Sequence, residues 1–370
     1  MTTFTPSRRR VLGALGAAVT GGAAGCLGGP GDTGGGATAE PTATATPERS
    51  SIQVLLDWKA NATHAGHFVA TSRGFYEAEG LTVDLVSGKG GASTAKQVGL
   101  EKYPLGLSSA AATLGTLDEG VPLRAYAAAQ QGPNSVVYTT ADALGGQLDG
   151  PESLAGKTVA VPPAASNLAL LKTILTDAGV LGDVSFLEVG WGGLTSSVLS
   201  GDANAALGAF PDGISLDREG HDAAMLWIAD YIPTVGRSVV ASPAFAESNP
   251  ETLRAYLRAT ARGWAWASND PEGAMDLLVA ARPRLEASYD LGVTKIEYTA
   301  KRLILTDAVR EHGWGWQSDD AWQTVVDALV AADFLSEQVA VADAWTNEYL
   351  DTADPYVGTY ASQVSIDYEL

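Results

Sequence analysis

The apolar residues of this chain form short runs separated by polar turns and helix-like segments. The run Ile52 to Leu56 has the pattern of a buried strand and breaks at Asp57-Trp58. A helix-like segment with His64 and Phe68 follows, and a second apolar run, Leu81 to Val86, reads as the next strand. A strand, a helix and a parallel strand make a βαβ unit, so the pattern predicts an α/β fold.

Polar side chains that follow the apolar runs are candidate site residues. In parallel sheets, ligands bind beyond the carboxyl ends of the strands. Trp58, Asn61 and His64 follow the first run, and we expect them to face a ligand. Core packing is the alternative for Trp58, and a capping role is the alternative for His64. Later runs and turns supply further hydrogen-bonding candidates, namely Ser108, Ser109, Gln130, Ser166 and Asn167.

A second α/β unit begins near Gly156 and supplies aromatic candidates. Trp191 lies in a Gly-rich loop after the predicted strand over 184–189, and Phe210 and Asp212 follow the predicted strand over 205–209. If Trp191 faced Trp58 across a cleft, the two rings would suit a planar heterocycle. Covering the core of this second unit is the alternative for Trp191.

The C-terminal third is predicted to be helical. Pro250 and Pro271 each follow a capping residue and precede an acid, a pattern typical of helix starts. Leu253, Leu257 and Trp264 share one face of the first of these helices. About 320 residues follow the leader and linker described next, which is too long for one typical core and predicts two lobes.

The N-terminus has the pattern of an export signal. Arg8 to Arg10 precede an Ala/Gly-rich apolar stretch, and a small-residue site precedes Cys26. We therefore predict a twin-arginine signal peptide over 1–25, with Cys26 as the lipidated first residue of the mature chain. A spanning anchor is disfavoured because Val11 to Gly25 is too short and too rich in Gly. Residues 26–50 are rich in Gly, Thr, Ala and Pro and predict a flexible linker.

The charge of the chain is strongly negative, with 23 basic and 43 acidic residues. Removal of the signal leaves 20 basic residues and a net charge of −23. This composition is typical of haloarchaeal-type proteins, whose acidic surfaces require salt to screen self-repulsion. It argues against nucleic acid as a partner.

Candidate cofactor and metal sites are weak in the sequence. The stretch Ser87 to Thr94 is Gly-rich, but it lacks nucleotide-loop spacing and favours a strand-to-helix turn over an anion site. The four His residues are not at zinc-site spacings, and Cys26 is the only Cys. We therefore expect neither a cofactor nor a metal, and no internal disulfide.

The opening segment resembles a known family. Asp57-Trp58, His64, Gly74-Phe75-Tyr76 and Gly80-Leu81 match the opening of solute-binding proteins that capture thiamine pyrimidine precursors. The yeast-type hydroxymethylpyrimidine phosphate synthases share that fold. The resemblance continues more weakly almost to the C-terminus.

The resemblance implies a two-lobed type II periplasmic binding protein fold with a ligand cleft and two hinge crossings. We expect residues 51–138 and 242–370 in lobe 1 and residues 139–241 in lobe 2. Together with the export signal, it indicates a monomeric solute-binding protein, not an enzyme, that is anchored outside the cytoplasmic membrane and passes its solute to the permease of an ABC importer. The expected solute is a thiamine pyrimidine precursor, hydroxymethylpyrimidine or formylaminopyrimidine. The same broader fold binds alkanesulfonates, nitrate and riboflavin, which remain alternatives.

Two departures from the family pattern bear on the ligand and on catalysis. Ile214 stands near the position where relatives carry a Glu that pairs with the aminopyrimidine, and Asp212 is the candidate substitute. The synthases carry clustered cysteines in the segment corresponding to 230–237, where this chain has none. A synthase-like enzyme is therefore the disfavoured alternative.

Overall fold

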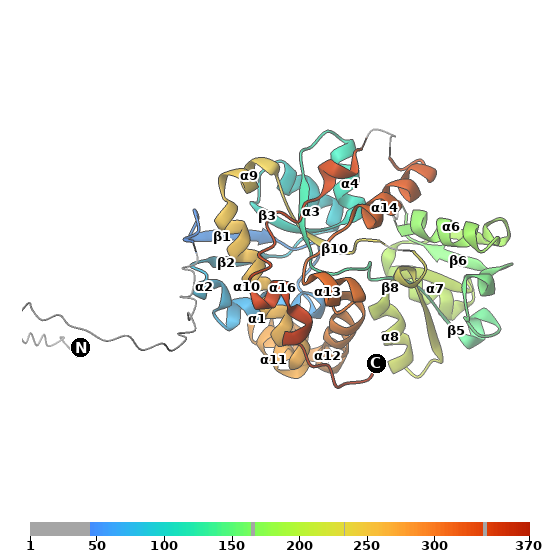
Figure 1. Cartoon of the computed structure of the whole chain (residues 1–370). Helices are drawn as coiled ribbons and strands as arrows, with labels where there is room; N and C mark the ends of the chain where they lie inside the picture. The colour runs from blue at the N-terminus through green and yellow to red at the C-terminus, as the bar shows by residue number, and fades with distance from the viewer. Residues whose placement is uncertain (1–44, 164–166, 233, 336–338) are drawn as a thin grey trace, which may run out of the picture. The chain divides into compact units, whose positions relative to one another are not determined.

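The chain forms two five-stranded sheets of the same plan (Figure 1), in a computed structural model that describes residues 45–163, 167–232, 234–335 and 339–370. The strand order is β2-β1-β3-β10-β4 in the first sheet and β7-β6-β8-β5-β9 in the second. Each sheet is mixed, because β10 runs antiparallel to β3 and β4, and β5 runs antiparallel to β8 and β9.

The first sheet begins with the predicted βαβ unit. Ile52 pairs with Val83, so the expected parallel pairing of these two runs is confirmed. The strands of this sheet are β1 (Ser51–Leu55), β2 (Thr82–Val86), β3 (Leu105–Ser109), β4 (Arg124–Ala128) and β10 (Arg237–Ala241).

Helices cover both faces of the first sheet, as apolar faces on both sides require. One face packs against a core that includes α1 (Ala65–Ser72), α2 (Phe75–Ala78), α10 (Pro250–Asn269) and α11 (Pro271–Ala281). The other face packs with α3 (Gly91–Gly99), α4 (Ala110–Asp118) and α14 (Asp319–Ala331). The predicted shared face of α10 is confirmed, because Leu253, Leu257 and Trp264 are all buried.

A glycine contact brings α1 close to α10. A Cβ at Gly66 would lie 2.4 Å from the Trp264 ring, and one at Gly263 would lie 2.2 Å from the Gly66 carbonyl oxygen. Any larger residue at either position would push the two helices apart. Close packing of α1 against α10 therefore requires glycine at position 66.

The second sheet has the same layered arrangement. Its strands are β5 (Ser135–Thr140), β6 (Thr158–Val161), β7 (Ser185–Glu188), β8 (Ala205–Ala209) and β9 (Ala223–Trp227). One face packs against α6 (Asn167–Asp177), and the other against α7 (Leu194–Ser200) and α8 (Phe210–Arg218). Figure 1 shows these three helices, in green to yellow-green, around the second sheet.

The remaining helices join or cover these layers. They are α5 (Ala141–Leu144), α9 (Pro243–Ser248), α12 (Tyr289–Tyr298), α13 (Asp307–His312), α15 (Val341–Ala344) and α16 (Pro355–Gly358), with a π-helical segment, Thr299–Ile304, directly after α12.

The lobe boundaries expected at residues 138 and 241 fall within β5 and at the end of β10. All of β5 pairs in the second sheet, so the chain leaves the first sheet before Ser135. All of β10 pairs in the first sheet, so the chain has returned by Arg237. The apolar runs of β5 and β10 continue the patterns before and after them, which hides the change of sheet in the sequence.

Candidate functional site

A cavity of about 350 Å³ is lined by residues from both sheets. Its polar side chains come from strand ends and first helical turns, namely Asp57, Ser109, Gln130, Asn134, Ser135, Asn167 and Arg237. Trp191 and Phe334 contribute aromatic rings. A concave site with few, convergent polar groups is the usual form of a small-molecule site.

The sheet topology explains why these residues meet. Asp57, Ser109 and Gln130 lie at or just beyond the carboxyl ends of β1, β3 and β4. Because β10 is antiparallel to its neighbours, its first residue, Arg237, lies at the same edge. Asn134 occupies the equivalent place before the antiparallel strand β5 of the second sheet.

Four of the predicted site residues line this cavity: Ser109, Gln130, Asn167 and Trp191. The Asn167 side chain donates to Ser135 Oγ over 3.1 Å, and Ser109 caps α4 by accepting from the Ala112 N–H. Trp191 is 59% exposed, in a short 3₁₀ turn flanked by glycines. Its ring is thus available to a ligand and is not part of the core.

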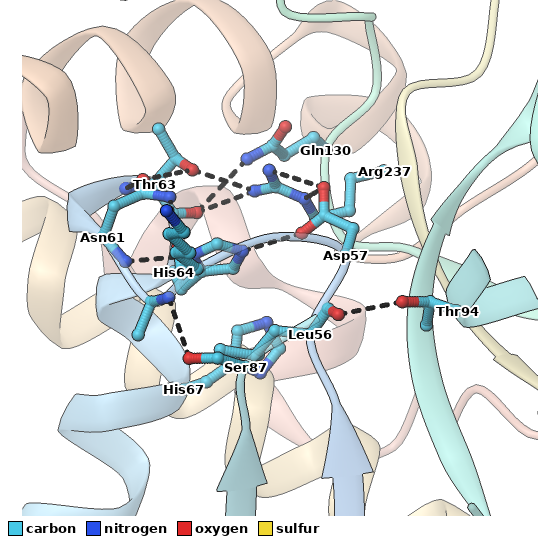
Figure 2. Close-up of polar contacts among 12 residues, drawn as sticks. Leu56, Asp57, Asn61, Thr63, His64, His67, Ser87, Thr94, Gln130 and Arg237 are labelled. Atoms are coloured by element: carbon cyan, nitrogen blue, oxygen red, sulfur yellow. Dashed lines mark hydrogen bonds and ion pairs between the residues drawn. The ribbon is translucent and has the colours of Figure 1, made fainter. Parts of the chain in front are cut away.

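An ion pair that the sequence analysis did not identify lies at the cavity wall (Figure 2). The Arg237 Nε donates to Asp57 Oδ2 over 3.0 Å, and His64 Nε2 lies 2.7 Å from Asp57 Oδ1. Arg237 Nη1 also donates to the Thr63 carbonyl oxygen over 2.8 Å. The Asp57 side chain keeps 21% of its surface exposed, whereas that of Arg237 keeps 8%.

Hydrogen bonds fix the tautomer of His64. The Asn61 backbone N–H donates to His64 Nδ1 over 3.3 Å, so Nδ1 carries no proton and Nε2–H donates to Asp57. Burial, followed by the nearby charge of Arg237, lowers the pKa of His64, so the ring is neutral. The side chain of Asn61 caps the short 3₁₀ turn Ala62–His64 by accepting from Thr63 N–H.

The carboxylate of Asp57 stays charged in this setting. Burial by itself raises its pKa, but the charge of Arg237 and the hydrogen bond from His64 outweigh burial and hold the pKa far below its usual range. Asp57 and Arg237 are the charged residues among the described residues that line the cavity, so the lining is electrically balanced.

Other predicted site residues lie elsewhere in the structure. Trp58 is 50% exposed but does not line the cavity, and Ser108 is buried with its Oγ 3.3 Å from the Ser109 carbonyl oxygen. Phe210 is fully buried and stacks on Trp227 and on Tyr298, with ring centroids 5.3 and 5.8 Å apart.

The proposed substitute for the missing Glu is also turned away from the cavity. Asp212 accepts from the Ala209 N–H over 3.1 Å and closes the N-terminus of α8. Ile214 is buried in the core of the second sheet. Ser166 and Cys26 lie outside the described residues.

Asp57 and Arg237 were missed for different reasons. Asp57 belongs to the sequence motif, but the neighbouring Trp58 is the larger candidate ligand contact. The strand-end rule covers the carboxyl ends of parallel strands, whereas Arg237 opens an antiparallel strand. A single Arg at the start of a returning apolar strand was the available signal.

Two negative findings apply to the described part of the chain. Among residues 45–163, 167–232, 234–335 and 339–370, no cluster of His, Cys, Asp or Glu could hold a metal ion. Within those ranges, too, no helix has the length and apolar character needed to cross a bilayer.

The chain is similar in sequence to known binding proteins. The chain is 29% identical over 314 residues to a formylaminopyrimidine-binding protein of Halalkalibacterium halodurans, covering 83% of this chain and 92% of the relative. It is 24% identical to the riboflavin-binding protein RibY of Chloroflexus aurantiacus, covering 85% of this chain and 90% of the relative.

A solved structure shows the same fold. The periplasmic nitrate-binding protein NrtA of Synechocystis superposes with a TM-score of 0.65 at 13% identity, covering 87% of this chain and 92% of that one. The fold is therefore that of periplasmic binding proteins. The family model described as "NMT1/THI5 like" matches residues 61–274, more than half of the chain and most of the cavity lining. The chain belongs to the NMT1/THI5-like family.

Proposed function

We propose that this chain is the solute-binding protein of an ABC importer and that its solute is a small, planar, uncharged heterocycle. A thiamine pyrimidine precursor, hydroxymethylpyrimidine or formylaminopyrimidine, fits best. The relative named as a formylaminopyrimidine-binding protein supports this choice, because the match extends over 92% of its length. Riboflavin is the alternative within the same ligand class, supported by the RibY relative.

The observation that carries the proposal is the fixed carboxylate of Asp57 in an electrically balanced cavity. A carboxylate accepts strongly from the N–H groups of an aminopyrimidine, in a charge-assisted hydrogen bond. Arg237 and His64 already orient it, so little freedom is lost when a ligand binds. Relatives carry a Glu in the second unit near position 214, where this chain has Ile214, and Asp212 does not line the cavity. Asp57, beyond the first strand of the first sheet, takes the role of that carboxylate.

The exposed ring of Trp191 supports a planar ligand. Aromatic rings stack on heterocycles in offset or edge-to-face arrangements. Gln130, Asn134 and Asn167 add amide donors and acceptors around the same cavity. This combination of aromatic rings and several amides favours a flat polar molecule over an aliphatic one.

An anion such as a sulfonate or nitrate is the second candidate. The first turns of α3 and α4 line the cavity, and the positive ends of their dipoles favour negative charge. Against an anion, Arg237 is already paired with Asp57, whose own charge would repel it. The balance favours the uncharged ligand.

Two features oppose a synthase. The segment corresponding to the cysteine cluster of those enzymes contains no Cys, and Cys26 is the only Cys of the chain. The predicted export signal would also separate the protein from cytoplasmic substrates. We propose that the protein acts outside the cytoplasmic membrane, held there by a lipid on Cys26.

Mass spectrometry of the ligand retained on purified protein tests the proposal directly. An aminopyrimidine released on denaturation would support it. Retained riboflavin would shift the ligand within the heterocycle class, whereas a sulfonate or nitrate would overturn the uncharged ligand. Titration calorimetry with 4-amino-5-hydroxymethyl-2-methylpyrimidine, riboflavin and an alkanesulfonate would then rank the three.

A further inference from the structure

The C-terminal helical segment formed by α12 and the π-helical residues Thr299–Ile304 contacts the second sheet at an aromatic stack. The ring of Tyr298 lies 5.8 Å from that of Phe210 and 6.0 Å from that of Trp227, with interplanar angles of 19° and 7°. Phe210 and Trp227 are themselves buried in the core of the second sheet. This segment is therefore part of the second sheet's packing.

Arg302 adds an ion pair and a cation–π contact next to this aromatic stack. Arg302 Nη2 lies 2.8 and 2.6 Å from the two carboxylate oxygens of Asp230, and its guanidinium lies 4.9 Å above the Trp227 ring. Asp230 ends the short 3₁₀ turn Ile228–Asp230 that follows β9. The ion pair and the cation–π contact thus act on one element of the second sheet.

Two neighbouring residues of the π-helical segment pack in different cores. Ile304 packs in the core of the first sheet, with α1 and α10, whereas the adjacent Leu303 packs in the core that holds Phe210 and Trp227. The Leu303 carbonyl oxygen accepts from the Gln131 N–H over 2.6 Å, in the passage between β4 and β5. An extra residue in a helical turn is a frequent feature of functional sites.

We propose that α12 and the π-helical segment form a latch that holds the two sheets in the arrangement that closes the cavity. The cavity is lined from both sheets, so it persists only while their separation is fixed. The chain also passes between the sheets before β5 and before β10, and such passages act as hinges in two-lobed binding proteins. Arg302 and Tyr298 add non-covalent contacts that must break before those hinges open.

The latch then controls how fast a solute leaves. A contact that stabilises the closed arrangement lowers the population of the open one, and solute leaves from the open one. The part of this inference that concerns solute rests on the proposed function, whereas the conformational part does not. The two parts need separate measurements.

Arg302→Met tests the latch, since it keeps an unbranched apolar side chain and removes the guanidinium charge. Arg254→Met is the matched control, because Arg254 lies 3.6 Å from Glu251 and 5.2 Å above the Tyr349 ring, within the first sheet's layers. Asp230→Asn removes the same ion pair from the other side. Each is made in the full chain with Cys26→Ser.

Spin labels at exposed Ser72 and Glu188, introduced as cysteines, report the separation of the two sheets without any ligand. We expect Arg302→Met and Asp230→Asn to add a longer-distance population, and Arg254→Met to leave the wild-type distribution. Identical distributions in all four proteins would overturn the latch.

Stopped-flow dissociation of 4-amino-5-hydroxymethyl-2-methylpyrimidine supplies the second readout. We expect both latch variants to release this probe at least threefold faster than wild type and than Arg254→Met. Unchanged release despite a longer-distance population would overturn control of solute release by the latch. A wild-type protein that fails to bind the probe would count against the proposed ligand, and the distance measurement would still decide the latch.

Discussion

The Asp57 carboxylate and the Arg237 guanidinium lie 180 residues apart in the sequence, and Nε and Nη2 of the Arg both lie 3.0 Å from Asp57 Oδ2. The pair joins the first strand of the first sheet to the strand that returns from the second sheet. A contact of this kind ties the ligand site to the point where the chain crosses between sheets. We therefore expect the pair to contribute to stability and, under the proposed function, to recognition, and the two roles need separate tests.

Asp57→Asn should lower both stability and affinity. It leaves Arg237 buried without its counter-charge, and breaking a buried pair typically costs about 3–5 kcal/mol. An amide also accepts more weakly than a carboxylate, so we expect roughly tenfold weaker binding of the aminopyrimidine probe. Thermal unfolding and titration calorimetry measure the two effects.

The double variant Asp57→Asn/Arg237→Gln separates the two roles. Removing both charges relieves the unpaired guanidinium, so stability should recover in part relative to Asp57→Asn. Affinity for the probe should not recover, because the carboxylate that accepts from the ligand's N–H groups is still missing. Recovery of both properties would mean that Asp57 acts only through Arg237.

Trp191→Ala should weaken binding without destabilising the fold. The ring is 59% exposed, so its removal leaves no core cavity, whereas loss of stacking costs about 1 kcal/mol or several-fold in affinity. Trp58→Ala is the matched control, because Trp58 is 50% exposed and does not line the cavity. Equal losses in the two variants would return Trp58 to the site, as the sequence motif predicts.

The sequence predicted the α/β fold well because short apolar runs separated by turns encode strands and helices locally. The parallel pairing of β1 and β2 and the buried face of α10 are examples. The lobe boundaries were less accessible, because β5 and β10 are apolar runs that look alike in either sheet. Which sheet a strand joins depends on long-range pairing.

The site was predictable where it follows the strand-end rule and not where it depends on antiparallel strands. Ser109, Gln130 and Asn167 follow that rule and line the cavity. Phe210 also follows a strand, but its ring is held in the core by Trp227 and Tyr298. The sequence pattern shows where a helix starts and does not show towards which side its first residue points.

Acid should destabilise the protein through its buried histidines. Burial lowers the pKa of His67 to about 3, against about 6.5 in an unfolded chain. Below pH 6.5 the unfolded chain therefore binds a proton that the folded chain does not. Stability falls as the pH drops from about 6.5 towards about 3, by up to about 1.4 kcal/mol per pH unit for this group, and His64 acts in the same direction.

Denaturant unfolding at several pH values measures this slope. His67→Gln should flatten the dependence of stability on pH, because Gln does not titrate. Gln can also keep a hydrogen bond to the Tyr256 hydroxyl, which lies 3.1 Å from His67 Nδ1. His312→Gln is the control, because 39% of the His312 side chain is exposed. A slope unchanged by His67→Gln would assign the acid sensitivity to other groups.

Salt should stabilise the folded chain more strongly than it does ordinary proteins. After removal of the predicted signal the chain has 43 acidic and 20 basic residues, and their mutual repulsion opposes a compact state. Raising the ionic strength from about 0.1 to 1 M shortens the Debye length from roughly 10 to 3 Å, so most repulsion between exposed charges is screened. The surface ion pair Lys96–Glu119 weakens under the same screening, but such pairs contribute about 0–1 kcal/mol.

We therefore expect the melting temperature to rise steadily with KCl. Sucrose, which strengthens burial without screening charge, is the control; an equal rise in sucrose would show that exclusion from the surface, and not charge screening, stabilises the fold.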